Sequence, residues 1–268
     1  MHLPGPAALL AAARERDPAR PLITHYDDAT GERIELSATT LANWVAKTEN
    51  LLQDEFDVGP GSTVALALPV HWQTAVVLLG VWSCGGTVLD GAAEDEGGLA
   101  GVDVVLAAQD RLPALEEQDV DAELVGLSLH PLGGGMAGYV GPARDFAVEV
   151  RTAGDRFVPY QDPDPAAPGL VAGGMELTLA GLVEAAGEIA ARLQIAEGDR
   201  ILIDEDTAAE AGPVAWLLAP LAAGASLVLC RHAVAEQLPD RAAAERVTAT
   251  LGRHVDGVRQ LGRTADRG

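Results

Sequence analysis

The sequence contains little cysteine and almost no lysine. Its 268 residues include two cysteines, Cys84 and Cys230, and each lies within an apolar segment. This placement indicates buried thiols in a reducing cytoplasm and argues against a disulfide framework. Lys47 is the single lysine beside seventeen arginines, so lysine-dependent chemistry has one candidate. No two histidines have the spacing of metal ligands, and we expect no metal.

Positive charge is also scarce, since the formal net charge is −22. The long-range field of such a chain repels polyanions, which excludes nucleic acid and anionic membranes as partners. Residues 231–268 are the exception, because seven arginines there outnumber five acidic residues. One hypothesis that follows is that the arginine-rich segment 253–267 docks on an acidic protein surface.

Long apolar runs are interrupted. The longest, residues 213–230, contains Pro220 and Gly224, which predict a helix followed by a strand rather than a membrane span. The alanine-rich run at residues 7–13 lacks a preceding positive region, so it predicts a surface helix rather than an export signal. We therefore expect a cytoplasmic protein.

What the chain does contain is the alternation of an α/β protein. The apolar run TVALAL at residues 63–68 predicts a strand of a parallel sheet that is covered on both faces. An apolar helix at 72–84 and a strand at 87–89 follow it. Two short strands around residues 27–31 predict a hairpin. Residues 145–151 fit either a strand or a short helix.

The order of these segments occurs twice. Gly61 and Gly198 are 137 residues apart, and Gly86 and Gly224 are 138 apart. A strand and a helix lie between Gly61 and Gly86, and again between Gly198 and Gly224. The spacing predicts two pseudo-repeated, mostly parallel sheets flanked by helices. Chance similarity of two βαβ pieces is the alternative.

The repeat and the composition together predict a domain organisation. Four prolines and three aspartates at residues 155–168 are typical of a linker. The predicted parts are a first α/β subdomain at 1–154, the linker at 155–168, a second α/β subdomain at 169–250 and a flexible, arginine-rich tail at 251–268.

Residues 162–193 have the order of segments in a nucleotide-binding unit. A proline-rich stretch leads into a short strand, a turn at Gly173-Gly174 and an amphipathic helix that Thr178 can cap. Such a turn holds phosphate with its amides, the helix N-terminus and usually a lysine. Here Glu176 stands where a cation would be useful.

Taken in order, these segments resemble the large N-terminal domain of the adenylate-forming enzymes, which include acyl-CoA and aryl-CoA synthetases. The resemblance covers about residues 20 to 250 and implies two stacked α/β subdomains. The matching residues are Pro21-Leu22-Ile23, Leu41 to Leu52, Val58 to Leu66, Gly85-Gly86, Asp164 to Ala167, Leu177-Thr178, Gly198-Asp199-Arg200 and Leu221 to Leu229.

The resemblance also shows what this sequence lacks. The phosphate loop of the family, T/S-S-G-T-T-G-x-P-K-G, should stand between the strand after Asp-Pro-Ala and the Leu-Thr helix. Residues 171–176 (VAGGME) occupy that interval, without hydroxyls or lysine. No residue matching the family's adenine site or its C-terminal domain with the catalytic lysine is found. The chain is therefore identified as a truncated, degenerate N-terminal domain, and we expect no ATP or AMP binding and no catalytic residue.

Three residues keep the vestigial phosphate-loop position, namely Gly173, Gly174 and Thr178. They are the candidate cofactor-binding residues, although a tight strand-to-helix turn left by a deletion is the favoured explanation of the two glycines, and Glu176 beside them strengthens it.

Other polar motifs have simpler structural explanations. Residues 133–135 predict a mobile glycine loop rather than a phosphate cradle. His71-Trp72 fits a packed helix start better than a pocket mouth. The acidic runs 94–96 and 204–206 predict solvated loops, since neither has the oxygen spacing of a calcium loop. No G-x-S-x-G nucleophile motif is present.

The leading functional hypothesis is a non-catalytic, acyl-CoA-synthetase-like binding or scaffold module, with another protein or an acyl or aryl ligand as its partner. The competing hypothesis is an AMP-dependent acyl-activating enzyme, or a nucleotide- or acyl-binding subunit, that needs a partner chain.

Overall fold

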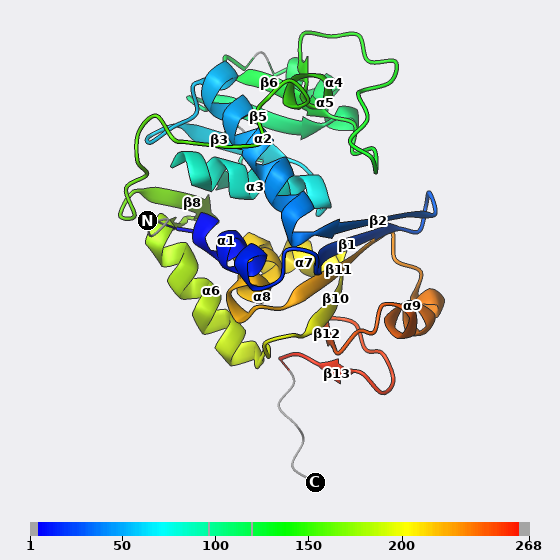
Figure 1. Ribbon diagram of the computed structural model, residues 1–268. Helices are drawn as coiled ribbons and strands as arrows, with labels where there is room; N and C mark the ends of the chain where they lie inside the picture. The colour runs from blue at the N-terminus through cyan, green and yellow to red at the C-terminus, as the bar shows by residue number, and fades with distance from the viewer. Residues whose placement is uncertain (1–4, 96, 119, 263–268) are drawn as a thin grey trace. The chain divides into compact units, whose positions relative to one another are not determined.

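The computed structural model describes residues 5–95, 97–118 and 120–262 (Figure 1). Its contacts divide the chain into two compact units. The first contains the described residues up to Ala8 with Ala42–Pro69 and Gln73–Leu182. The second contains Leu9–Leu41, Val70–Trp72 and the described residues from Val183 onward. Each unit is built on one mostly parallel sheet, so the predicted α/β fold is confirmed.

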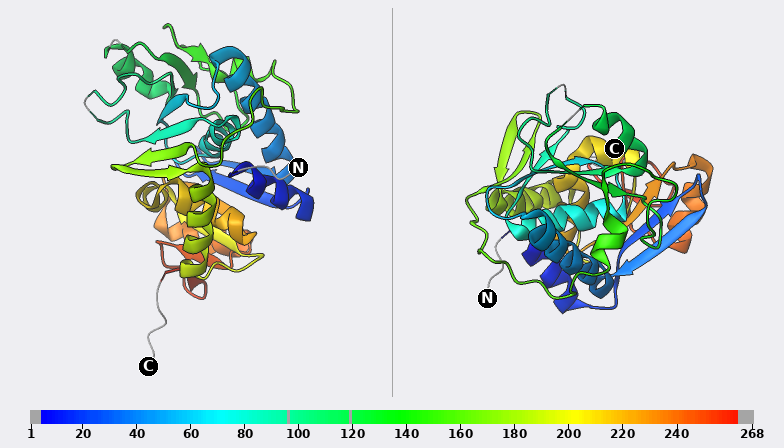
Figure 2. Two further views of the ribbon diagram at one scale, coloured as in Figure 1. Left: turned by 90° about the vertical axis from the view of Figure 1, so that its left-hand side faces the viewer. Right: turned by 90° about the horizontal axis from the view of Figure 1, so that it is seen from above.

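The sheet of the first unit has the strand order β7-β6-β5-β3-β4-β8-β9. Neighbouring strands are parallel except for the antiparallel pair β8 and β9, which forms one edge (Figure 2). The strands are β3 (Thr63–Ala67), β4 (Thr87–Asp90), β5 (Val104–Ala108), β6 (Glu123–Leu127), β7 (Arg144–Asp145), β8 (Pro168–Ala172) and β9 (Met175–Thr178). The inner strands are apolar on both faces, and β5 is buried throughout.

Helices α2 (Ala38–Phe56) and α3 (Trp72–Cys84) contribute most of their length to this unit. They approach closely at Gly80, where an added Cβ would lie 3.1 Å from the side chain of Thr48. Trp82 is buried and its Nε1–H donates to Gly169 O at 2.7 Å, which joins α3 to β8. The short helices are α4 (Leu112–Glu116) and α5 (Phe146–Val150). The undecided segment at 145–151 is thus mainly a helix.

The sheet of the second unit has the order β13-β12-β10-β11-β1-β2, and only β1 and β2 are antiparallel. Its strands are β1 (Pro21–Asp27), β2 (Glu32–Ser37), β10 (Arg200–Asp204), β11 (Ser226–Arg231), β12 (Ala249–Leu251) and β13 (Arg259–Gln260). The helices are α1 (Ala7–Arg16), α6 (Leu179–Leu193), α7 (Glu205–Pro213), α8 (Ala219–Ala223) and α9 (Leu238–Ala244). A π-helical segment, Val214–Leu218, joins α7 to α8.

The same building block begins each half of the repeat. Hairpin β1–β2 starts at Pro21, has a bulge after it, and leads into α2, which Ser37 caps through the Thr40 amide at 3.1 Å. Hairpin β8–β9 starts at Pro168, has the same bulge, and leads into α6. Each hairpin extends one sheet, while the strand after its helix lies in the other. Consecutive segments of the chain therefore alternate between the two sheets.

The glycine register of the repeat needs a correction of one residue. Gly224 ends α8 in the left-handed conformation (φ +72°), and its counterpart at the end of α3 is Gly85 (φ +85°) rather than Gly86. In both places the following amide donates to the carbonyl five residues earlier, from Gly86 to Val81 and from Ala225 to Pro220. Only the residue with positive φ requires glycine, so Gly85 is the equivalent position.

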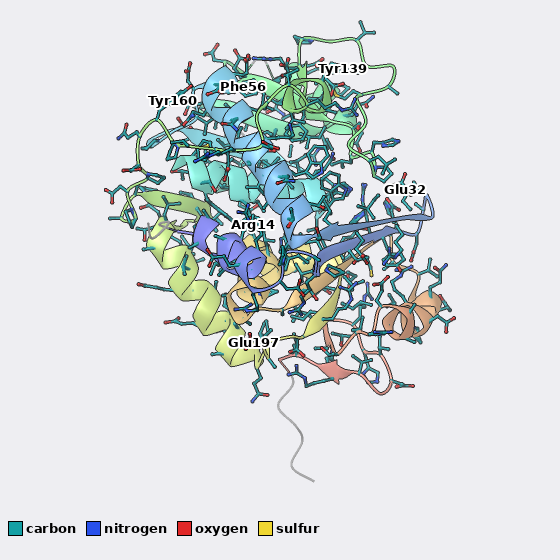
Figure 3. The ribbon with its side chains drawn as sticks, viewed as in Figure 1. Arg14, Glu32, Phe56, Tyr139, Tyr160 and Glu197 are labelled. Carbon is teal, nitrogen blue, oxygen red and sulfur yellow. The ribbon has the colours of Figure 1, made fainter. Side chains whose placement is uncertain are left out.

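Residues 155–168 lie against α2 in this structure. Tyr160 donates from its hydroxyl to Asp54 at 2.8 Å and from its amide to Gln53 Oε1 at 2.8 Å (Figure 3). Asn50 donates to Arg156 O at 3.1 Å. Side chains of α2 thus hold the segment that composition alone assigns to a linker. The domain boundaries at 1–154, 155–168 and 169–250 stay a prediction.

Part of the predicted flexible tail, residues 251–262, contains a paired strand, and the flexibility of the tail stays a prediction. Within this range β13 pairs with β12, and Leu261 is buried. The remainder of the predicted tail, residues 263–268, lies outside the described residues. Among the described residues, no helix is both long and apolar enough to cross a bilayer.

Candidate functional site

Gly173 and Gly174 form the tip of the β8–β9 hairpin. Ala172 pairs with Met175 in the ladder, so the loop contains two residues. Both glycines have positive φ, +55° and +78°, which is the conformation that a two-residue hairpin turn requires. The predicted strand-to-helix turn is wrong, because residues 175–178 pair with β8 before helix α6 starts.

Thr178 caps α6, as the sequence predicts. Its Oγ1 accepts a hydrogen bond from the Gly181 amide at 3.0 Å. The amides of Leu179 and Ala180, which precede Gly181 in the first turn, also donate hydrogen bonds. Leu179 donates to Ala167 O at 3.0 Å, and Ala180 donates to Pro165 O at 2.9 Å. An anion at a helix N-terminus needs free amides, and the chain's own oxygen atoms already accept from these three.

The three candidate cofactor-binding residues therefore lie at two places. The glycine tip is exposed and has no heavy atom within 4 Å of an added Cβ, whereas Thr178 lies at the opposite end of β9. Glu176 is exposed on the strand between them. Ligand binding by Gly173, Gly174 and Thr178 stays a prediction.

A polar cluster occupies the carboxyl ends of the parallel strands in the second unit. In open α/β sheets, ligands bind at this edge. Asp27 ends β1, and it pairs with His232 (Oδ1 to Nδ1, 2.8 Å) and Arg231 (3.7 Å). Burial would raise the pKa of Asp27, but hydrogen bonds from His232 and the Ala29 amide outweigh it, so the pKa lies below its usual value.

Asp204 and Glu205 complete this cluster. Asp204 ends β10, is buried, and accepts hydrogen bonds from the Thr207 amide at 3.1 Å and from Arg253 Nε at 2.9 Å. Glu205 pairs with Arg231 at 3.3 Å. The predicted solvated loop at 204–206 is wrong for Asp204, because this residue joins a central strand to the N-terminus of α7. The carboxylates at this edge are bound to arginine, histidine and amide donors of the same chain.

Two arginines of the arginine-rich segment 253–267 also form ion pairs with carboxylates of the same chain. Arg253 pairs with Asp204, and Arg259 pairs with Asp199 and donates to Gln194 O at 2.7 Å. These two partly exposed arginines are thus already paired with carboxylates of the same chain, and docking by the segment stays a prediction. The arginines after residue 262 lie outside the described residues.

Two buried histidines meet beneath this edge. His25 of β1 and His71, just before α3, have ring centroids 4.4 Å apart in an edge-to-face arrangement. Burial lowers the pKa of His25 to about 4 and that of His71 well below its usual value, so both rings are neutral at pH 7. His71 and Trp72 are buried, and the packed helix start that the sequence favours is confirmed.

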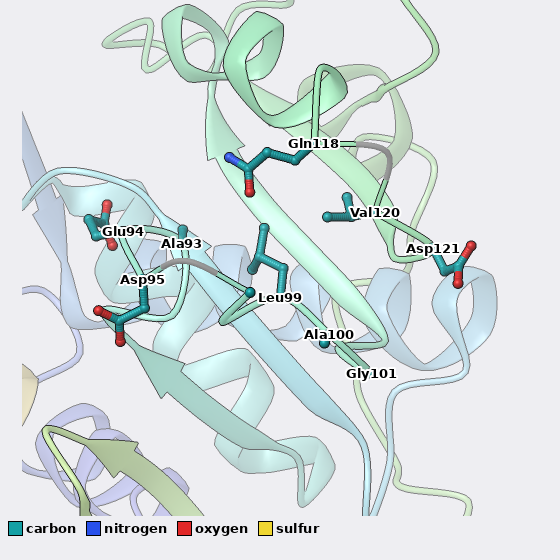
Figure 4. A pocket seen from close by; sticks show the side chains of 10 residues that line it. Ala93, Glu94, Asp95, Leu99, Ala100, Gly101, Gln118, Val120 and Asp121 are labelled. Atoms are coloured by element: carbon teal, nitrogen blue, oxygen red, sulfur yellow. The ribbon is translucent and has the colours of Figure 1, made fainter.

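A cavity of about 610 Å³ lies among loops of the first unit (Figure 4). Apolar Leu99 and Val120 line it together with acidic Glu94, Asp95 and Asp121. Within the described ranges, no group of three or more His, Cys, Asp or Glu side chains is arranged to hold a metal ion. Glu94 and Asp95 are exposed in a turn, as predicted; the third residue of that acidic run lies outside the described residues.

The sequence alone does not predict the histidine pair or the ion-paired carboxylates at the carboxyl ends of the second sheet, and the reason is the same for both. The residues involved come from β1, β10, β11 and the start of α3, which are far apart in the chain. The available signal is their common position after predicted parallel strands, where side chains converge.

No family model matches the chain. A curated relative is the TIGR03089 family protein of Mycobacterium tuberculosis (strain ATCC 25618 / H37Rv). It is 44% identical over 252 residues, which are 91% of this chain and 96% of the relative.

Solved structures share the fold at lower identity. Brucella canis acyl-CoA synthetase superposes with a TM-score of 0.75 and 18% identity over 92% of this chain and 47% of that chain. The N-terminal domain of FACL13 from M. tuberculosis superposes with a TM-score of 0.71 and 16% identity, over 92% of this chain and 62% of that chain. A benzoate CoA ligase from Burkholderia xenovorans LB400 superposes with a TM-score of 0.71 and 18% identity, over 92% of this chain and 50% of that chain. The chain thus spans about half the length of these proteins, and the fold that the resemblance implies is confirmed.

Proposed function

Because the chain belongs to the TIGR03089 family and has the acyl-CoA synthetase N-terminal fold, we propose that it is a non-catalytic binding or scaffold protein of the cytoplasm. One observation carries the proposal. The position where the resembling enzymes have their phosphate loop is a two-residue Gly173-Gly174 turn, and the first amides of α6 are already bonded.

The size of the rate contribution that a phosphate loop makes supports the proposal that adenylation activity is lost. Positioned donors that stabilise charge on a transferring group are each worth on the order of 10²- to 10³-fold in rate. A two-glycine turn offers no hydroxyl or ammonium group, and Glu176 beside it repels phosphate. The contribution that the loop supplies is therefore absent from this hairpin.

The carboxyl edge of the second sheet supports the same proposal. Asp27, Asp204 and Glu205 are paired with Arg231, Arg253 and His232. A ligand that enters there must replace these pairs, and leaving one buried carboxylate unpaired costs about 3–5 kcal/mol. Two buried, free thiols fit the proposed reducing compartment.

The test is an assay for acyl-adenylate formation. The protein is incubated with ATP, Mg²⁺ and a panel of fatty and aryl acids, and acyl-AMP is measured by mass spectrometry. We expect none above a heat-inactivated control. Acyl-AMP from the chain alone would overturn the proposal, whereas acyl-AMP that forms only after addition of a partner chain would establish the competing subunit hypothesis. Binding of an acid without ATP would identify the ligand class of the module.

A further inference from the structure

An arginine-lined cavity lies at the amino ends of β1, β10 and β11, the opposite edge of the second sheet from the histidine pair. Its volume is about 450 Å³, within the range of small-molecule sites. Its charged lining consists of four arginines and two glutamates, a net charge of +2 in a chain whose net charge is −22. These residues are Arg20, Arg33, Arg200, Arg246, Glu35 and Glu245.

Three of the arginines are fixed by contacts within the unit. Arg20 donates to Gly224 O at 3.2 Å and Asp199 O at 3.4 Å. Arg33 and Arg200 both pair with Glu245, at 2.9 and 2.5 Å. Burial opposes ionisation of Glu245, but these arginines and the Tyr26 hydroxyl lower its pKa to about 2. Arg33 also pairs with Glu35 at 2.7 Å. The two lining glutamates therefore hold Arg33 and Arg200 in place, and the excess positive charge at the cavity comes from Arg20 and Arg246.

Arg246 differs from the other three. It is exposed and makes no ion pair within the part of the chain that the structure describes. Its φ is +53°, in the left-handed region. It follows the C-terminus of α9, where its amide donates to Ala243 O and the Val247 amide donates to Ala242 O. Glycine or asparagine usually occupies this position because a larger side chain is unfavourable there.

We infer that this cavity binds a small polyanion with at least two carboxylate or phosphate groups, and that Arg246 is its main free anchor. The guanidinium fork matches both kinds of oxyanion. The inference also gives Arg246 a role that offsets its unfavourable backbone conformation, since strain of this kind collects at ligand sites. The site is separate from the vestigial phosphate-loop position, so it stands or falls independently of the proposed function.

The test uses calorimetry and thermal shift with pyrophosphate and citrate, each at constant ionic strength set with sodium chloride. We expect one of them to bind and to raise the melting temperature. Arg246→Gly should weaken that binding roughly 10-fold or more, and should raise the melting temperature of the free protein because glycine relieves the left-handed backbone. Glu35→Gln removes a lining negative charge and should tighten binding. Arg192→Ala, an exposed site on α6 outside the cavity, is the charge-matched control.

Each result decides the question. Binding of pyrophosphate alone assigns phosphate groups, and binding of citrate alone assigns carboxylates. No binding of either probe overturns the inference. Equal affinity in Arg246→Gly and Arg192→Ala also overturns it, because a general charge effect then explains the binding. A lower melting temperature in Arg246→Gly with unchanged affinity would show that Arg246 has only a structural role.

Discussion

Glu49 provides the sharpest prediction about stability. It lies on α2 and is buried against α3, where the Cys84 thiol donates to its backbone carbonyl at 3.5 Å. Burial raises the pKa of the Glu49 carboxyl to about 7 from 4.5, although a hydrogen bond with Ser83 opposes this. The folded first unit therefore binds a proton that the unfolded chain releases.

The sign and size of the effect follow from proton linkage. Below pH 4.5 the carboxyl is protonated in both states, and its contribution to stability is fully present. As pH rises through 7 the buried carboxylate must form, and about 3 kcal/mol of unfolding free energy is lost. Glu49→Gln keeps the shape of the protonated acid without a charge. This variant should match the wild type near pH 4.5 and exceed it by about that amount at pH 8.

Urea unfolding at intervals from pH 4.5 to 8.5 measures the difference, and hydrogen exchange of α2 and α3 peptides locates it in the first unit. Glu188→Gln, at an exposed site on α6, is the matched control and should keep the wild-type profile. A Glu49→Gln profile parallel to the wild type at every pH would refute the reasoning.

Three further predictions concern other sites. Burial lowers the pKa of His25 to about 4 from 6.5, so stability of the second unit is present above pH 6.5 and lost as pH falls toward 4; His25→Gln should flatten this acid limb in urea unfolding, and an unchanged limb would contradict the assignment. Gly173→Ala and Gly174→Ala should each cost about 1–2 kcal/mol in urea unfolding because of positive φ, and neutral variants would argue against the two-residue turn. Arg241→Met should destabilise by about 3–5 kcal/mol because it leaves Asp28 buried and unpaired, and adding Asp28→Leu should recover much of the loss.

The central strands and helices are predictable because their signals are local. The run TVALAL becomes β3, the apolar segment after it becomes α3, and the two glycine pairs locate the repeat to within one residue. Hydrophobic period and glycine at helix ends are properties of a few neighbouring residues.

The hairpin at residues 168–178 shows the limit of such reasoning. The four residues of β9 carry too few alternations to separate a strand from the first turn of a helix, and only their pairing with β8 decides. The same holds for β12 and β13, which are three and two residues long. Of these, β13 and the last residue of β12 fall in the predicted tail. Sheet pairing is non-local, so sequence periodicity cannot report it for such short strands.

The charged sites depend on distant residues in the same way. Asp204 belongs to an acidic run that predicts solvent exposure, yet it is buried because β10 ends there. The arginine-lined cavity joins residues from β1, β2, β10 and the turn after α9. No spacing in the sequence marks that set.

Calorimetric titration of ATP with Mg²⁺ into the wild type and Arg246→Gly tests the central claim most directly. Our account predicts that neither protein binds ATP with micromolar affinity through the Gly173-Gly174 hairpin, and that any weaker binding to the wild type is lost in Arg246→Gly because it occurs at the arginine-lined cavity. Micromolar ATP binding that persists in Arg246→Gly would contradict the account.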